Sequence, residues 1–235
     1  MAATLSTIGF DADDTLWQNE QFFRFTEQEF AKLLADHGDH GTISARLLDA
    51  ERRNLGHYGF GVKGFTLSMI ETAIEVTEGR APATVISRIL EIGRDLMDHP
   101  METLPGAVET LEALADDFTI VMITKGDLFH QEKKLAQSGL GDFFDAIEIV
   151  SDKKPATYRT LFARHGDGPE HAMMVGNSLK SDIIPAIEAG GWGVHVPHEL
   201  TWALEHADAP WESQRFREIP TLAELPELVD RLAAS

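Results

Sequence analysis

The sequence predicts an α/β protein with a doubly wound parallel sheet and an inserted helical domain. Short apolar segments alternate with helical segments near the N-terminus and again from about residue 105 onwards. Between them, the spacing of apolar residues is helical throughout and indicates no strand. Alternating strands and helices fold as parallel sheets. We therefore expect a Rossmann-like α/β core made of residues 1–16 and 100–235, and an all-helical cap made of residues 17–99.

The composition restricts the possible partners. The 235 residues carry a net charge of −19, from 39 acidic and 20 basic side chains. So acidic a chain repels phosphate backbones, which argues against general nucleic-acid binding, and an anionic substrate requires local cations. The absence of cysteine excludes disulfides and thiolate metal sites. With no apolar run long enough for a signal peptide or a membrane span, we expect a cytoplasmic protein without a membrane partner. The sequence leaves the oligomeric state open.

The first apolar segment, residues 8–10, reads as a buried strand and is followed at once by a cluster of carboxylates. The cluster consists of Asp11, Asp13 and Asp14. Like charges at a strand end repel one another, and Mg²⁺ is the cation that prefers such oxygen ligands. The alternative is a solvated acidic turn or a helix N-cap. Solvated turns are rarely framed by residues as apolar as Phe10, Leu16 and Trp17.

Four amphipathic segments make up the expected cap. They are Glu20–His37, Ile43–Leu55, Phe65–Val76 and Pro82–Met97. The segment Gly59–Gly64 matches the pattern GxGxxG, but a helix precedes it where a dinucleotide-binding loop requires a strand. We expect a flexible loop between helices or a loop that faces substrate. Four basic residues of the cap are either substrate contacts or solvated helix faces: Arg52, Arg53, His57 and Lys63.

Strands and helices alternate from about residue 105. The expected elements are a helix at Gly106–Ala115, a strand at Phe118–Ile123, a helix ending near Ser138, a strand at Ala146–Val150, a helix through Tyr158, a strand at Ala172–Val175, a helix through Asp182 that ends at Gly190, a strand at Trp192–Val196 and a last helix at Leu222–Leu232.

Polar residues follow four of the expected strands. These segments are Asp11–Asp14, Thr124–Asp127, Ser151–Lys154 and Gly176–Asp182. The carboxyl ends of parallel strands meet at one edge of a sheet, where ligands bind in open α/β folds. The sequence therefore predicts one site assembled from all four segments.

These residues resemble the haloacid dehalogenase-like (HAD) hydrolase superfamily, in its phosphatase branch with an inserted helical (C1-type) cap. Its first motif, Asp-x-Asp-x-Thr, is met by Asp11, Asp13 and Thr15. The second, a Thr or Ser ending a strand, is met by Thr124. The third, a Lys commonly followed by Pro, is met by Lys154, which is therefore preferred to its neighbour Lys153. Gly176 and Asp182 match the fourth motif.

The resemblance implies a role for each residue. Asp11 is the expected nucleophile and Asp13 the expected general acid and base. The resemblance places Mg²⁺ on the Asp11 side chain, the Asp13 backbone carbonyl and Asp182. Thr124 and Lys154 are expected to bind phosphoryl oxygens. Substrate contacts are expected from Thr15, Lys125 and Gly126, and Asp14 has no assigned chemistry.

Two positions depart from the family pattern. Asn177 stands where the family usually has Asp, and we expect it to orient a metal-bound water at a lower Mg²⁺ affinity. Lys125 stands where related phosphatases often have Asn. It either adds a cation beside the phosphate or pairs with a local acid such as Asp127.

The function that the resemblance implies is Mg²⁺-dependent hydrolysis of a small phosphorylated metabolite through an aspartyl-phosphate intermediate. Asp13 favours phosphate esters over haloacids, because a halide leaving group needs no proton and an alkoxide does. Two alternatives remain: a phosphomutase of the same fold, and a binding or regulatory protein that has lost turnover, which Asn177 motivates. The connections at residues 18–19 and 100–101 are the expected hinges of cap closure.

Overall fold

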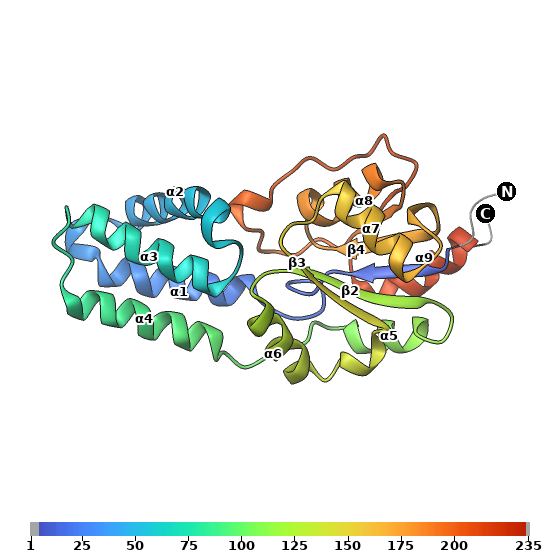
Figure 1. Cartoon of the computed structure of the whole chain (residues 1–235), viewed down its shortest axis with the longest axis horizontal. Coiled ribbons are helices and arrows are strands. Elements are labelled where there is room, and N and C mark those ends of the chain that lie inside the picture. Colours follow the sequence, from blue (N-terminus) through green and yellow to red (C-terminus); the bar gives the residue numbers. More distant parts are fainter. Residues whose placement is uncertain (1–4, 234–235) are drawn as a thin grey trace. The chain divides into compact units, whose positions relative to one another are not determined.

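A six-stranded parallel sheet forms the centre of the α/β part of the chain (Figure 1). The computed structural model describes residues 5–233. The strand order is β3-β2-β1-β4-β5-β6, and every neighbouring pair is parallel. The strands are β1 (Thr7–Phe10), β2 (Thr119–Lys125), β3 (Ala146–Val150), β4 (Ala172–Gly176), β5 (Trp192–His195) and β6 (Phe216–Glu218). This confirms the predicted fold class.

The register aligns the carboxyl ends of the three central strands. Phe10 on β1 lies opposite Met122 on β2 and opposite Val175 on β4. The residues that follow these three positions therefore emerge at the same edge of the sheet. The strand order reverses between β1 and β4, which is where ligands bind in open α/β sheets.

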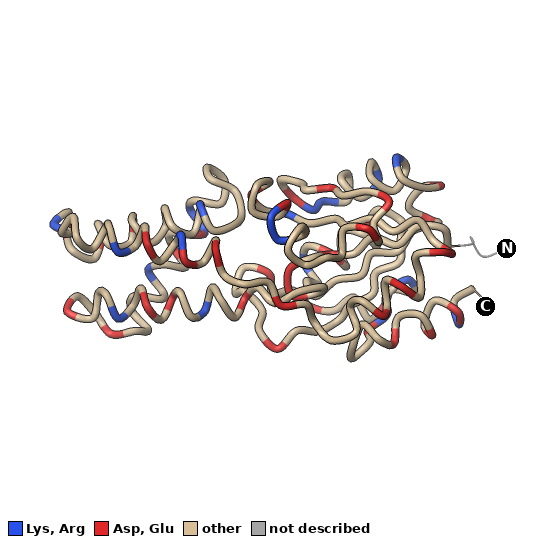
Figure 2. Tube along the Cα trace, turned by 90° about the horizontal axis from the view of Figure 1, so that it is seen from below, with Lys and Arg blue, Asp and Glu red and all other residues tan. Residues whose placement is uncertain are grey.

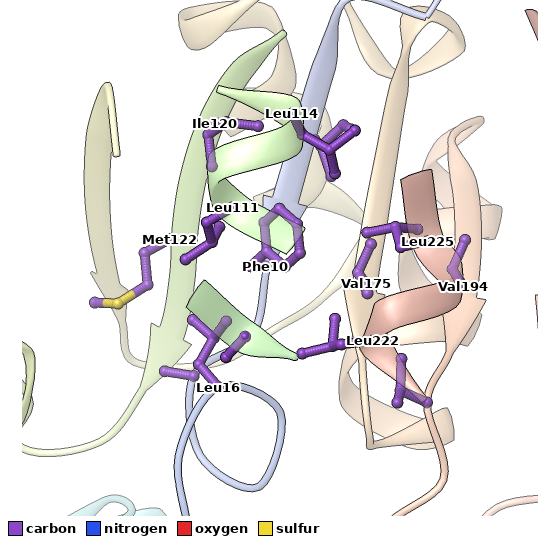
Figure 3. Close-up of a cluster of buried hydrophobic side chains, with 14 of the residues drawn as sticks. Phe10, Leu16, Leu111, Leu114, Ile120, Met122, Val175, Val194, Leu222 and Leu225 are labelled. Carbon is purple, nitrogen blue, oxygen red and sulfur yellow. The ribbon is translucent and has the colours of Figure 1, made fainter. Parts of the chain in front are cut away.

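Helices cover both faces of the sheet (Figure 1). They are α5 (Ala107–Leu114), α6 (Leu128–Ser138), α7 (Pro155–His165), α8 (Ile184–Ala189) and α9 (Leu225–Ala233). Side chains from α5 and α9 pack on one face around Phe10 and Met122 (Figure 3). On the other face, side chains from α7 and α8 pack against Val121 and Ile123. The alternation along β2, with neighbouring residues in opposite cores, is the two-residue period of a strand buried on both sides.

The second compact unit is helical. It contains α1 (Glu20–Leu33), α2 (His40–Tyr58), α3 (Val62–Val76) and α4 (Ala83–Met97). All four helices contribute to one core, which includes Phe30, Leu47, Met69 and Ile89. The amphipathic spacing seen in the sequence accounts for this packing, because each helix buries only one face.

Contacts along the chain divide it into two units. The α/β unit holds residues 5–18, 101–125 and 131–233, and the helical unit holds residues 19–100 and 126–130. The segment 126–130, which follows β2, thus groups with the helices although the sequence suggested a place in the core. The extent of the cap as a domain, and hinges at residues 18–19 and 100–101, stay predictions.

The sequence missed some local structure. The short edge strand β6 was not expected, because a three-residue strand has too few positions to display a period. The loop at Gly59–Gly64 is shorter than expected, since α3 begins at Val62. The chain around Asp182 forms a π-helical turn, η4 (Leu179–Ile183), before α8 begins.

Acidic and basic residues occur on both units, with acidic residues in the majority over the whole sequence (Figure 2). Within residues 5–233, no helix combines the length and apolar character needed to cross a bilayer.

Candidate active site

The loop after β1 folds back on itself directly at the sheet edge. The Asp11 amide still donates to Val175 O on β4 (2.9 Å), which holds Asp11 at the end of the strand. The Leu16 amide donates to Ala12 O (2.8 Å) and the Asp14 amide donates to Trp17 O (2.7 Å). Asp14 adopts a positive φ of 59°, a conformation that Asp and Asn tolerate better than most residues. Backbone bonds thus close the tight loop, and bonds from Trp17 Nε1 to Asp13 Oδ1 (2.7 Å) and from Thr15 Oγ1 to Asp11 Oδ2 (3.3 Å) join side chains within it.

Asp11 and Asp182 share one lysine. The Lys153 ammonium lies 2.5 Å from Asp11 Oδ1 and 2.7 Å from Asp182 Oδ1, and its side chain is 1% exposed. Burial and the Asp182 charge raise the pKa of Asp11 to about 7, although Lys153 opposes this shift. Burial disfavours the Lys153 ammonium, but the two carboxylates raise its pKa above the ordinary value. The two carboxylates thus keep Lys153 protonated between them.

The prediction that Lys154 lies in the site is corrected by its position. Its side chain is 68% exposed and pairs with Asp152 (2.9 Å). Lys154 occupies the N-cap of α7 in an extended conformation, directly before Pro155. Successive side chains of an extended segment point in opposite directions, so only one of two adjacent lysines can face the site. That lysine is Lys153, which the motif had ranked second.

Asp13 is anchored by three donors. Trp17 Nε1 donates to Asp13 Oδ1 (2.7 Å), and Lys134 on α6 donates to the same oxygen. Gln131 Nε2 donates to Asp13 Oδ2 (3.0 Å). Burial raises the pKa of Asp13, but the charge and hydrogen bond of Lys134, with the bonds from Trp17 and Gln131, together hold it below its usual range. Asp13 is therefore ionised and fixed in orientation at neutral pH.

Thr15 joins the Asp11 loop to the loop after β4. Its hydroxyl lies 3.3 Å from Asp11 Oδ2 and 3.4 Å from Asn177 Oδ1. The same hydroxyl accepts a bond from the backbone N–H of Asn177 (3.0 Å). His195, at the end of β5, contacts this loop through Nε2, which lies 3.1 Å from Asn177 O. Its Nδ1 lies 2.8 Å from Glu218 Oε2 on β6. The carboxyl ends of β1, β4, β5 and β6 are therefore joined by side-chain bonds.

The turn after β4 presents Asp182. The Ser178 amide donates to Asp182 Oδ2 (3.0 Å), and the carboxylate rests against the backbone of Gly176. A Cβ at position 176 would lie 2.3 Å from that same oxygen. Glycine is required here because the carboxylate occupies the space of a side chain.

The site residues expected at the end of β2 have different surroundings. Thr124 is fully buried, and its hydroxyl accepts a bond from Gln131 Nε2 (2.8 Å). Lys125 pairs with an acid, Glu205 (2.5 Å), which lies far from it in the chain. Asp127 instead pairs with Lys63 (2.8 Å) within the helical unit. Gly126 belongs to the segment that groups with that unit and has a φ of 144°.

The carboxylate and amide oxygens at the sheet edge are suitable ligands for a hard divalent cation. Asp11 and Asp182 already converge on one cation, and the oxygen of Asn177 lies beside the same loop. Among residues 5–233, no group of three or more His, Cys, Asp or Glu side chains is arranged to hold a metal. A metal held here by two carboxylates would need its other ligands from carbonyl or amide oxygens and water.

Several residues of the site were not expected from the sequence. They are Trp17, Gln131, Lys134 and Glu205, whereas Lys153 was named as the second candidate after Lys154. One signal was available: Gln131 and Lys134 are three positions apart in a helix, so they share a face, and Leu135 on the same helix is buried. Two polar residues on the buried side of a helix indicate a polar partner, here Asp13.

The chain is similar in sequence to known hydrolases. A family model for haloacid dehalogenase-like hydrolases matches residues 5–190. The chain is 26% identical over 207 residues to the glyceraldehyde 3-phosphate phosphatase of Methanothermobacter thermautotrophicus, covering 85% of this chain and 88% of that protein. It is 26% identical over 194 residues to the pyrimidine 5'-nucleotidase YjjG of Escherichia coli, covering 78% and 82%.

Solved structures show the same fold. A haloacid dehalogenase-like family hydrolase from Xanthomonas campestris has a TM-score of 0.88 and 45% identity, covering 98% of this chain and 93% of that one. The structure of the HAD-hydrolase YfnB of Bacillus subtilis bound to magnesium has a TM-score of 0.66 and 20% identity, covering 97% of this chain and 99% of that one. With its sheet topology, its strand-end residues and the match of the family model, the chain belongs to the haloacid dehalogenase-like hydrolase family.

Proposed function

We propose that this protein is a Mg²⁺-dependent phosphatase that hydrolyses a small phosphorylated metabolite. The observation that carries the proposal is the anchoring of Asp13 beside Asp11. Three donors hold the Asp13 carboxylate at the sheet edge. Such a group can protonate a departing alkoxide and can then activate water. A halide leaving group needs no proton, so the first step of a dehalogenation does not require this acid.

In the proposed reaction, an Asp11 oxygen attacks phosphorus and the bond from phosphorus to the ester oxygen breaks. Asp13 gives a proton to the departing oxygen. Asp13 then removes a proton from a water molecule, whose oxygen attacks the phosphorus of the aspartyl phosphate. The bond between phosphorus and Asp11 breaks, which releases inorganic phosphate and restores the carboxylate.

Asp13 must therefore carry a proton before the first step. It is ionised in the ligand-free protein, and an arriving phosphate places negative charge near it. That charge raises the pKa of Asp13 and favours proton uptake, while Lys134 limits the rise. Lys134 accordingly favours the ionised form that the second step requires.

The charges of the remaining residues support an anionic substrate. Lys153 balances part of the charge of Asp11 and Asp182, and Thr124 and Thr15 supply buried hydroxyls at the same edge. Asp11, Asp182 and the Asp13 carbonyl would hold Mg²⁺, which supplies charge neutralisation between the nucleophile and the phosphate. Lys154 takes no part in this proposal, because its side chain is exposed beside Asp152.

A screen of phosphomonoesters with and without Mg²⁺ tests the proposal. The panel includes glyceraldehyde 3-phosphate and pyrimidine nucleoside 5'-monophosphates, because relatives at 26% identity are named for them. We expect release of inorganic phosphate that depends on Mg²⁺ and is lost in Asp11→Asn. Isomerised sugar phosphate without phosphate release would identify a mutase. Mg²⁺ binding without turnover of any ester would identify a binding protein.

A further inference from the structure

The connection between β5 and β6 brings a buried acid to the sheet edge. Glu205 ends the short 3₁₀ turn η5 (Ala203–Glu205), and its side chain is only 14% exposed. One oxygen accepts a bond from Lys125 Nζ (2.5 Å). The other accepts bonds from Ser178 Oγ (2.6 Å) and from Ser181 Oγ. Burying a carboxylate without partners would be costly, and these donors offset that cost.

The donors to Glu205 belong to two segments of the candidate active site. Lys125 follows Thr124 at the end of β2 and also donates to Ser181 Oγ (2.6 Å). Ser178 and Ser181 lie before and within the turn that presents Asp182. The Ser178 amide donates to Asp182 itself (3.0 Å), so a shift of Ser178 would move the Asp182 carboxylate.

Further bonds hold η5 and η4 together. Lys180 Nζ donates to Leu204 O (2.6 Å), next to Glu205 in the chain. The Tyr158 hydroxyl on α7 donates to Ser181 O (2.9 Å). The turn around Asp182 is thus held by bonds from α7 and from η5, and the sequence indicated no site residue in η5.

The pairing with Glu205 also neutralises the charge of Lys125. Each of three lysines at the sheet edge faces a carboxylate: Lys153 faces Asp11 and Asp182, Lys134 faces Asp13, and Lys125 faces Glu205. Burial lowers the solvent screening of such pairs. The Glu205 carboxylate would repel a substrate anion placed at Lys125, and the Lys125 ammonium is already bonded.

We propose that Glu205 is a positioning and specificity-determining residue of this site. It holds Ser178 and Ser181 around Asp182, and it cancels the charge of Lys125 so that this lysine adds no affinity for anions. The site then favours phosphomonoesters that carry no second acidic group near Lys125. This inference rests on the proposed function, because it concerns a site that binds phosphate.

Calorimetric binding of inorganic phosphate, in buffer containing Mg²⁺, tests the inference without any turnover. The proteins are the wild type, Glu205→Gln, Lys125→Met, the double variant and Glu205→Asp. Gln keeps nearly the same shape and removes the charge, and its amide nitrogen replaces one of the two acceptor oxygens with a donor. We expect Glu205→Gln to bind phosphate about tenfold more tightly, and increasingly so at low ionic strength. Glu205→Asp keeps the charge and should therefore not bind phosphate more tightly than the wild type.

The double variant separates the two possible roles of Lys125. If Glu205 cancels Lys125, removing both charges returns the phosphate affinity to within about twofold of the wild type, although Lys125→Met alone weakens it. If Lys125 binds phosphate itself, the double variant stays clearly weaker than the wild type, and the inference is wrong. An unchanged or weaker affinity of a folded Glu205→Gln also overturns it, as does absence of phosphate binding in every protein. The expected pattern of affinities without turnover of any ester would contradict only the proposed function.

Discussion

The Lys153 ammonium lies 2.5 Å from Asp11 Oδ1, although the two residues are 142 positions apart in the chain. Both side chains are buried, at the end of β1 and in the loop after β3. The same ammonium reaches Asp182, so one lysine connects the loops of three strands. Because the Asp11–Lys153 pair is buried, each partner depends on the other for its charged form.

The first prediction separates the two adjacent lysines. Lys153→Met removes the only cation that touches both Asp11 and Asp182 among the contacts of the described residues. We expect kcat/KM for phosphate release to fall at least about 100-fold, the usual cost of losing a stabilising charge. Lys154→Met is the matched control and should retain activity within about twofold, since exposed ion pairs contribute little. A larger loss in Lys154→Met than in Lys153→Met would restore the expectation from the motif. Circular dichroism of both variants checks that they fold.

The second prediction concerns the proton carried by Asp13. Asp13→Asn should slow hydrolysis of an alkyl phosphate about 100-fold to 10,000-fold, because its poor leaving group needs a proton. With p-nitrophenyl phosphate, the leaving group needs no proton, and we expect a burst of p-nitrophenol followed by slow turnover. Asp14→Asn is the control, because Asn tolerates the positive φ of 59° and the position has no assigned chemistry. Equal losses for both esters without a burst would argue against general acid catalysis by Asp13.

The third prediction is a pH dependence of stability. The pKa of Asp11 is raised from 3.8 in the unfolded reference to about 7 in the folded protein by burial and by Asp182. Between these values the folded protein holds a proton that the unfolded chain has released, so stability falls as the pH rises. The penalty is absent below about pH 4 and complete above about pH 7. Asp11→Asn removes it.

Calorimetric melting in metal-free buffer measures this effect. The Tm of Asp11→Asn should match the wild type near pH 4 and exceed it increasingly up to about pH 7. A constant difference across that range would mean that Asp11 is ionised throughout. Mg²⁺ should reduce the advantage of the variant, because it stabilises the ionised carboxylate of the wild type.

The fourth prediction concerns Asn177. Its side-chain oxygen lies 3.4 Å from Thr15 Oγ1, beside Asp11. Asn177→Asp adds a negative charge to a site whose carboxylates converge on a cation, and we expect the Mg²⁺ concentration for half-maximal thermal stabilisation to fall about tenfold. Asp182→Asn is the counterpart and should weaken Mg²⁺ binding. Stabilisation by Mg²⁺ that is equal in both variants would place the metal elsewhere.

The periodic elements could be predicted because their signals are local. The β3 boundaries, Ala146–Val150, were predicted without error, and the helix beginning at Glu20 was predicted with its correct start. Strand β6 gave no such signal, since it is held mainly by its pairing with β5. A segment stabilised by a distant partner carries little evidence of its structure in its own residues.

By itself, the sequence determined the fold class and the composition of most of the site. Apolar periodicity reports burial, and parallel strands bring their carboxyl ends together, so Asp11, Asp13, Thr124 and Asp182 were expected at one edge. The tertiary structure alone decided which side chains face that edge. It selected Lys153 over Lys154, brought Lys134 to Asp13 and brought Glu205 to Lys125. These pairings join residues far apart in the chain, and the direction of each side chain depends on how its segment leaves the sheet.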